Sequence, residues 1–232
     1  MMAILECQDL CKDYGPKKVI KNVNLTIEKG KIVGLLGPNG SGKTTIIKLI
    51  NDLLVPTSGK VLINGMEPGI ETKKIISYLP ERTYLSFNMK VVELIKFFKD
   101  FYDDFDENKA LKLLKQLKIN ANDKLKTMSK GMKEKVQLVL VMSRKASLYI
   151  LDEPIGGVDP ATRDYILKTI MDNFNDDSTI IISTHLISDV EKILDDVIFI
   201  ADGKIKLTAG ADELRKERNA SIDEIFREEF KC

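Results

Sequence analysis

Cysteine is scarce in this sequence, whose 232 residues include only Cys7, Cys11 and Cys232. These residues form no CxxC pair and no even set, so we expect neither a disulfide framework nor a zinc site. Long hydrophobic runs are missing too, because residues 136–142 and 179–182 fall far short of the roughly 18 to 20 residues that cross a bilayer. The first residues lack the basic start and apolar core of a secretory signal, so we expect a protein that stays in the cytosol.

The sequence also lacks an excess of charge of either sign, since it has 36 Lys+Arg and 35 Asp+Glu and a formal net charge of +1. A nucleic-acid-binding domain is normally basic, so this balance argues against nucleic acid as a partner. The hydrophobic share of 44%, beside 31% charged residues, is typical of a globular protein and too high for a disordered one. The length fits one compact domain with a substantial core.

Short apolar segments alternate with segments of helical periodicity along most of the chain. Residues 32–36 form a continuous apolar run, typical of a strand buried on both faces, and a glycine-rich loop connects them to a helix predicted at 44–53. Further strands are predicted at 3–10, 19–27, 61–63, 75–79, 148–151, 179–183 and 197–201. This alternation predicts an α/β sheet.

Strand signals vanish in the middle of the chain, where we expect an inserted helical subdomain at about residues 82–145. Apolar side chains recur there at helical spacing, namely Leu94, Phe97, Phe98, Phe101, Leu111, Leu114 and Leu117. We interpret the aromatic ones as helical core and not as a binding surface. Residues 212–232 predict one or two short amphipathic helices with a packing stripe of Ile222, Ile225, Phe226 and Phe230.

Residues 37–45 read Gly-Pro-Asn-Gly-Ser-Gly-Lys-Thr-Thr and fit the phosphate-binding pattern G-x-x-x-x-G-K-[ST]. They lie between a buried strand and a helix, which is the context that a P-loop requires. Backbone N–H groups converge there on phosphate oxygens, and a Cβ at Gly42 would obstruct that approach. Lys43 would reach the β and γ phosphates, and the Thr44 hydroxyl would ligate magnesium. The predicted contacts of the nucleotide are Asn39, Gly40, Ser41, Gly42, Lys43, Thr44 and Thr45.

Residues 148–153, Leu-Tyr-Ile-Leu-Asp-Glu, supply an apolar strand that ends in two acids. Asp152 would hold the magnesium shell, and Glu153 would be the general base for the water that attacks the γ phosphate. The alternative is that these acids merely open a surface turn. His185, the only histidine, follows a predicted central strand, and ligands of α/β sheets bind at such strand ends. We interpret it as a γ-phosphate sensor and place it with Glu153 and Lys43 in the catalytic set, the alternative being a structural hydrogen-bonding residue.

Four motifs occur in a fixed order: the P-loop, Asp152-Glu153-Pro154, Gly157-Val158-Asp159-Pro160 and Ser183-Thr184-His185. In this order they resemble the ATPase subunit of an ATP-binding cassette (ABC) transporter, and the likeness runs from about residue 5 to residue 209. The resemblance implies that ATP and Mg²⁺ bind here. It also implies that Tyr14 stacks on adenine and that Asp159 belongs to the nucleotide site.

Residues 128–132, Met-Ser-Lys-Gly-Met, correspond to the signature motif of that family, usually Leu-Ser-Gly-Gly-Gln at the start of a helix. Ser129 is itself a good N-cap residue. The resemblance implies that Ser129 and Gly131 contact the γ phosphate bound to a second ATPase subunit, so that a head-to-tail dimer encloses two ATP molecules. The second subunit would be either another copy of this chain or a different cassette.

The sequence departs from the family at Lys130 and Met132 of the signature and at Glu81, where most of the family has glutamine. We interpret Glu81 as a direct magnesium ligand. Together with Tyr-Asp-Asp-Phe-Asp at 102–106, these departures resemble the ATPase subunits of small bacterial exporters of antibiotics and peptides, including bacitracin-type systems. In such proteins the segment corresponding to residues 82–88 receives a short helix of the membrane subunit; a packed linker is the competing interpretation.

The resemblance implies a P-loop core sheet with an N-terminal antiparallel β layer and an inserted helical subdomain, within one ATPase domain spanning residues 1–232. ATP binding would close two cassettes and hydrolysis would reopen them, which would drive a separate transmembrane permease from the cytoplasmic face of the membrane. The main alternative is a soluble cassette ATPase of DNA repair or the ribosome, but such proteins usually carry a second cassette or long coiled coils. A GTPase would need a guanine-reading Asn/Thr-Lys-x-Asp motif, which the sequence lacks. A non-catalytic binding module would not need Glu153 and His185, so their presence argues against it.

Overall fold

The computed structural model describes residues 3–230, so Cys232 lies outside the described residues. The strands are β1 (Ala3–Tyr14), β2 (Lys17–Glu28), β3 (Ile32–Leu36), β4 (Ser58–Ile63), β5 (Ile76–Leu79), β6 (Leu148–Asp152), β7 (Thr179–Thr184), β8 (Asp196–Ala201) and β9 (Lys204–Gly210). The helices are α1 (Lys43–Ile50), α2 (Ile70–Ile75), α3 (Val91–Phe101), α4 (Glu107–Gln116), η1 (Leu125–Thr127), α5 (Lys130–Met142), α6 (Pro160–Asn173), α7 (Ile187–Val190), η2 (Glu191–Ile193), α8 (Ala211–Arg218) and α9 (Ile222–Phe230).

The larger sheet has the strand order β5-β6-β7-β3-β8-β9, with parallel pairing throughout except for the antiparallel edge strand β9. The strands β3, β6 and β7 are buried along their whole length, which explains the apolar runs in them. The predicted α/β sheet is confirmed. Strand β9 was not predicted, although Ile205, Leu207 and Ala209 at its half-buried positions alternate with exposed polar residues, which is the pattern of a half-buried strand.

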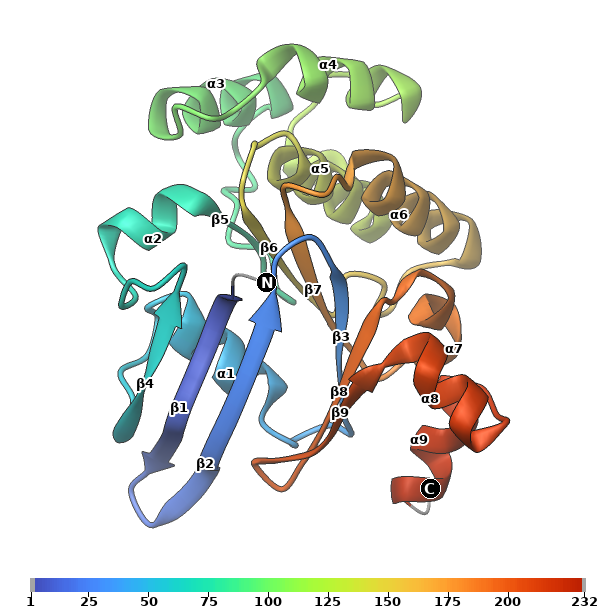
Figure 1. The fold of residues 1–232 in the computed structure, drawn as a ribbon. Helices are drawn as coiled ribbons and strands as arrows, with labels where there is room; N and C mark the ends of the chain where they lie inside the picture. The colour runs from blue at the N-terminus through green and yellow to red at the C-terminus, as the bar shows by residue number, and fades with distance from the viewer. Residues whose placement is uncertain (1–2, 231–232) are drawn as a thin grey trace.

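A second, antiparallel sheet of order β2-β1-β4 lies beside the first (Figure 1). Helix α1 contributes Ile46, Ile47 and Ile50 to one apolar cluster that also includes side chains of both sheets. The expected N-terminal antiparallel layer is therefore present, and α1 is packed where the two sheets meet. Cys7 and Cys11 in β1 are free thiols, as expected.

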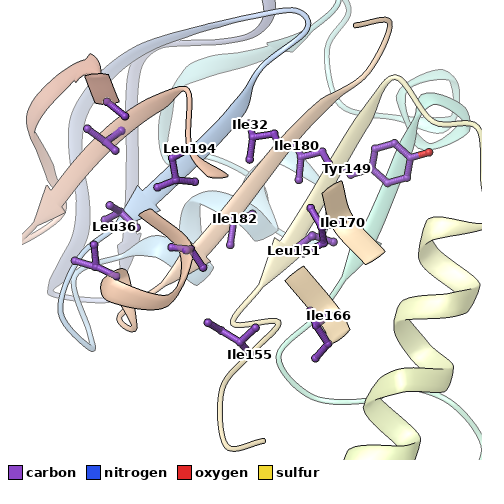
Figure 2. Close-up of a cluster of buried hydrophobic side chains, with 14 of the residues drawn as sticks. Ile32, Leu36, Tyr149, Leu151, Ile155, Ile166, Ile170, Ile180, Ile182 and Leu194 are labelled. Carbon is purple, nitrogen blue, oxygen red and sulfur yellow. The ribbon is translucent and has the colours of Figure 1, made fainter. Parts of the chain in front are cut away.

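The opposite face of the larger sheet is covered by the end of α5 and by helices that follow β6. Figure 2 shows Ile180 and Ile182 of β7 and Leu151 of β6 in one cluster with Ile166 and Ile170 of α6. The C-terminal helix α9 packs on the same cluster, where the Phe226 ring meets Phe199 edge-on at 5.4 Å. The stripe predicted at Ile222, Ile225 and Phe226 is thus buried in the core.

Helices α3, α4 and α5 form a separate apolar cluster at one end of the molecule (Figure 1). Leu94, Phe98 and Leu114 are buried in it, as predicted. The prediction is wrong for three of the other side chains, because Phe97 is 53%, Phe101 69% and Leu111 41% exposed. The apolar stripe of α3 is wider than the face it buries, so two phenylalanine rings stack on each other at the surface.

Candidate functional site

The loop between β3 and α1 requires glycine at two positions. Gly40 has a φ of +79° and Gly42 a φ of +113°, both in the region that side chains with a Cβ rarely adopt. A Cβ on Gly42 would also lie 2.7 Å from Ile20 Cδ1 of β2. This contact adds a packing reason to the phosphate clearance expected of Gly42. Helix α1 begins directly after this loop at Lys43, so its unpaired N-terminal N–H groups lie at the loop, as in an anion-binding site.

Lys43 connects this loop to the acids after β6. Its Nζ donates to the carbonyl oxygens of Gly37 at 2.7 Å and Pro38 at 3.3 Å, and it lies 3.7 Å from Glu153 Oε1. Burial lowers the pKa of Lys43, and the carboxylates of Glu153 and Asp152 oppose that shift. The side chain therefore holds a buried cation where phosphate oxygens would need one.

Asp152, the last residue of β6, is buried with one oxygen that lacks a partner. The Ser183 hydroxyl donates to Oδ1, whereas Oδ2 has no hydrogen-bond partner within residues 3–230. Burial raises the pKa of Asp152 above its ordinary value. The Ser183 hydrogen bond and the nearby Thr44 hydroxyl oppose this shift, and the charges of Glu153 and Glu81 add to it. A buried carboxylate oxygen without a donor fits a cation as its missing partner.

Glu153 has a strained backbone and a side chain held from two directions. Its φ is +50°, and its N–H donates to the carbonyl of Ser183 at 2.9 Å. The Thr184 hydroxyl donates to Oε2 at 3.1 Å, and His185 Nδ1 lies 3.0 Å from the same oxygen. Such strain at a non-glycine residue is characteristic of functional sites, where the surrounding structure holds a reacting group in place.

These groups line one cavity of about 1140 Å³. The predicted site residues on its wall are Tyr14, Asn39, Gly40, Ser41, Gly42, Lys43, Thr44, Thr45, Glu81, Asp152, Glu153 and His185. Of the residues predicted for the site, Ser129, Gly131 and Asp159 are not among its lining residues. The structure thus brings together the residues predicted for the P-loop, the metal and the γ phosphate, whereas Ser129, Gly131 and Asp159 lie outside the lining of that cavity.

Ser129, Gly131 and Asp159 instead form a second group at adjacent helix N-termini. The Ser129 hydroxyl accepts from the N–H of Met132 and caps α5, and Asp159 accepts from the N–H of Thr162 at 3.0 Å and caps α6. A Cβ on Gly131 would lie 3.8 Å from Asp159 Oδ2. The two helix N-termini therefore lie side by side, and their capping residues Ser129 and Asp159 lie outside the cavity lining of this chain.

Two of the three departures from the family pattern, Lys130 and Glu81, lie at the cavity wall. Lys130 Nζ donates to the carbonyl of Gly157 at 3.5 Å and lies 3.7 Å from Glu134 Oε1. The lysine is thus accommodated at the surface, against the loop that follows Glu153. Glu81 lies close enough to Lys43 and Asp152 for its charge to act on both.

Several residues of the cavity wall were not predicted, namely Lys17, Val19, Lys133, Glu134, Gln137 and Leu138. Arg82, Thr83 and Phe87, which were expected in a docking segment, line it as well. Lys17 could have been predicted as a residue of the cavity wall, because it follows Tyr14 closely in the sequence. The residues of α5 had none, since only the tertiary fold brings the start of that helix toward the P-loop.

The sequence model of the family described as ABC transporter matches residues 20–156, which is more than half of the chain. The chain belongs to the ABC transporter family. It is 33% identical over 217 residues to the ABC transporter ATP-binding protein YtrB of Bacillus subtilis, which covers 92% of this chain and 74% of YtrB. It is also 33% identical over 230 residues to the lantibiotic transport ATP-binding protein SrtF of Streptococcus pyogenes, which covers 98% of this chain and 97% of SrtF.

A solved structure of an ATP-binding subunit of an ABC transporter superposes with a TM-score of 0.87 at 30% identity, over 97% of this chain and 98% of that one. A bacterial Atm1-family ABC exporter with ATP bound gives a TM-score of 0.81 at 16% identity, over 99% of this chain and 42% of that one, and this likeness concerns the fold alone. The predicted family and P-loop ATPase fold are therefore confirmed. This ABC ATPase binds ATP and hydrolyses it.

ATP-binding subunits of ABC transporters partner with transmembrane components. No helix within residues 3–230 of this ABC ATPase is both long and apolar enough to span a membrane.

We expect Asp152→Asn to stabilise the nucleotide-free ABC ATPase by about 1 kcal/mol, a rise in Tm of about 2–4 °C. The amide removes a buried negative charge, while its Oδ1 still accepts from Ser183. Because the pKa of Asp152 is raised, the folded state binds the proton more tightly than the unfolded state. The free energy of unfolding of the wild type therefore falls as the pH rises from the ordinary carboxyl pKa through the raised pKa of Asp152. The gain should therefore be present at pH 7 and absent in strong acid.

Scanning calorimetry without nucleotide or magnesium measures this gain. The exposed Asp177→Asn serves as control and should leave Tm unchanged. A lower Tm for Asp152→Asn, or an equal rise in the control, would contradict the prediction.

Proposed function

We propose that the cavity holds one ATP molecule and that Glu153 is the base that activates the attacking water. The observation that supports this is the position of the Glu153 carboxylate, 3.7 Å from Lys43 Nζ and 3.0 Å from His185 Nδ1. The water would transfer a proton to Glu153 while its oxygen bonds to the γ phosphorus and ADP leaves. Lys43 stabilises charge that develops on the phosphates, and His185 orients Glu153 and senses the γ phosphate.

We further propose that the Thr44 hydroxyl and the Asp152 carboxylate hold Mg²⁺, with Glu81 as a further ligand. The unpaired Oδ2 of Asp152 supports this assignment. Bound there, Mg²⁺ would neutralise charge on the β and γ phosphates. Residues 39–45 would hold the phosphates through backbone N–H groups, and the half-exposed ring of Tyr14 would stack on adenine.

A second ATPase subunit would complete the site. The separation of Ser129, Gly131 and Asp159 from the cavity of their own chain supports this proposal, because capped helix N-termini suit an anion supplied by another subunit. The two subunits would be two copies of this chain, or this chain and another cassette. Each would act as one ATPase domain over residues 1–232, with a helical subdomain at about 82–145 and a short helical extension at about 212–232.

We propose that this ATPase drives an exporter of peptides or antibiotics through a separate transmembrane permease, at the cytoplasmic face of the membrane. The similarity to the lantibiotic transport protein SrtF and to the linearmycin resistance protein LnrL of Bacillus subtilis, 31% identical over 210 residues, supports this proposal. None of these relatives favours the soluble alternative. The exposed rings of Tyr84 and Phe87 support the segment at residues 82–88 as the docking site of the permease.

We expect Glu153→Gln to bind ATP but to hydrolyse it about 10² to 10⁴ times more slowly, because the amide cannot accept the proton of the attacking water. Fluorescent nucleotide binding and steady-state phosphate release measure the two quantities. Glu71→Gln, at an exposed position of α2, is the matched control and should leave both unchanged. Unimpaired turnover in Glu153→Gln would remove this residue from the role of base.

We expect Glu81→Gln to raise the magnesium concentration needed for half-maximal ATP hydrolysis, since the neutral amide is a weaker ligand of a hard cation. A magnesium titration at saturating ATP measures this concentration, again with Glu71→Gln as control. An unchanged magnesium dependence would count against direct ligation by Glu81.

The transporter proposal predicts that the untagged chain purifies from the membrane fraction with a detergent-solubilised, multispanning partner. Tyr84→Ala and Phe87→Ala together should reduce this recovery, because they remove apolar contacts at the docking segment. Ile70→Ala, which removes a still more exposed apolar side chain elsewhere, should not. If the wild-type chain is recovered without any such partner, the coupling to a permease is wrong while the ATPase activity stands.

A further inference from the structure

Arg144 is a buried arginine, 2% exposed, that lies outside the ATP cavity. It lies between the end of α5 at Met142 and the start of β6 at Leu148, so it occupies one of the connections between helices α3 to α5 and the larger sheet (Figure 1). A buried cation is costly unless it is fully hydrogen-bonded and paired. Its partners therefore indicate what the charge holds together.

One set of partners belongs to the segment between α3 and α4. Arg144 Nε donates to Asp104 Oδ1 at 2.9 Å, and Nη2 donates to Asp104 Oδ2 at 3.1 Å, which makes a bidentate pair. The guanidinium carbon lies 3.8 Å from the centre of the Tyr102 ring. Two backbone bonds reinforce the contact, from Lys145 N to Asp104 O at 3.1 Å and from Asp106 N to Ser143 O at 2.8 Å.

The other set of partners belongs to the sheet side of the molecule. Nη1 donates to the carbonyl of Ile76, the first residue of β5, and to that of Lys73 at 3.4 Å. Nη2 donates to the carbonyl of Lys74. Lys73 and Lys74 lie in the last turn of α2, whose carbonyls have no partners within the helix. One guanidinium thus connects the segment between α3 and α4 to the start of strand β5.

These contacts use all five N–H donors of the guanidinium, which is planar and always charged. A lysine has three donors on one nitrogen and cannot reach the same acceptors in their forked arrangement. The position therefore specifies arginine and not merely a positive charge.

The two strands attached to Arg144 are those that carry the acids of the site. Strand β5, bonded at Ile76, leads to Glu81 at the cavity wall. Tyr149 lies in β6, three residues before Asp152. Its hydroxyl donates to the backbone carbonyl of Arg144 at 2.6 Å. We propose that Arg144 is a positioning residue for ATP hydrolysis, which sets the helical end of the molecule and the strands that end at Glu81 and Asp152 in one fixed arrangement. This inference rests on the ATPase activity and on the roles proposed for Glu81 and Asp152, and not on the proposed permease.

The test is Arg144→Lys, which keeps the charge but loses the forked bonds. We expect kcat for ATP to fall by about threefold or more, because small displacements of reacting groups slow chemistry strongly, while the dissociation constant for ATP changes by less than about twofold, since the P-loop is not displaced. Hydrogen exchange measured by mass spectrometry should become faster in β5 and in residues 102–106, where the bonds are lost.

A matched control is Arg215→Lys, because Arg215 also bonds a carboxylate, that of Asp212, and a backbone carbonyl, that of Glu191. It lies at the C-terminal helices, and its kcat should stay within about twofold of wild type. Asp104→Asn keeps the carbonyl bonds of Arg144 but weakens its link to the helices, so it should lower kcat with unchanged ATP affinity. This variant decides the question if Arg144→Lys does not fold.

The proposal is overturned if kcat falls by less than about threefold in Arg144→Lys, or if kcat and ATP affinity fall together in step with a loss of folded protein. The second result would make Arg144 a purely structural residue, whereas a fall in kcat alone is what a positioning residue produces.

Discussion

The parallel register of β6, β7 and β3 is the constraint on which the ATP site depends. Asp152 pairs with Ser183, and Thr184 pairs with Leu36, so the three strands end at the same level and about 4.8 Å apart. The acids after β6, the histidine after β7 and the glycine-rich loop after β3 therefore emerge side by side at one edge of the sheet. Residues from three distant parts of the chain meet there because their strands are adjacent, without any direct sequence connection.

That arrangement places several charges where water is scarce. The Asp152 carboxylate lacks a donor for one oxygen, Lys43 is a buried cation, and Glu153 has a strained backbone. Each feature costs stability in the protein without nucleotide. The apolar layers on both faces of the sheet, which bury β3, β6 and β7 completely, supply the stability that offsets this cost. The stability of the core thus allows the site to keep buried polar groups that lack partners until a substrate supplies them.

The sequence was sufficient to predict features that depend on local pattern. The P-loop, the apolar inner strands and the acids after β6 each carry a short signature whose meaning does not depend on distant residues. Features that depend on tertiary packing escaped prediction. The exposure of Phe97 and Phe101 could not be inferred, because helical spacing shows which residues share a face but not how much of that face a neighbour covers. Arg144 carries no local signal at all, since its acceptors are backbone carbonyls of residues 68 to 71 positions earlier.

Helix α5 shows why such a residue is needed at its end. It contributes Val136, Val139 and Leu140 to the cluster of the helical end, and Leu138, Val141 and Met142 to the core under the sheet. Apolar contacts of this kind resist separation but only weakly resist sliding, because they have no direction. Hydrogen bonds and a bidentate ion pair are directional. A fork of five bonds at the C-terminal end of α5 therefore fixes the orientation that apolar packing leaves free, and a helix of 13 residues, about 20 Å long, extends that orientation to Ser129 and Lys130 at its other end.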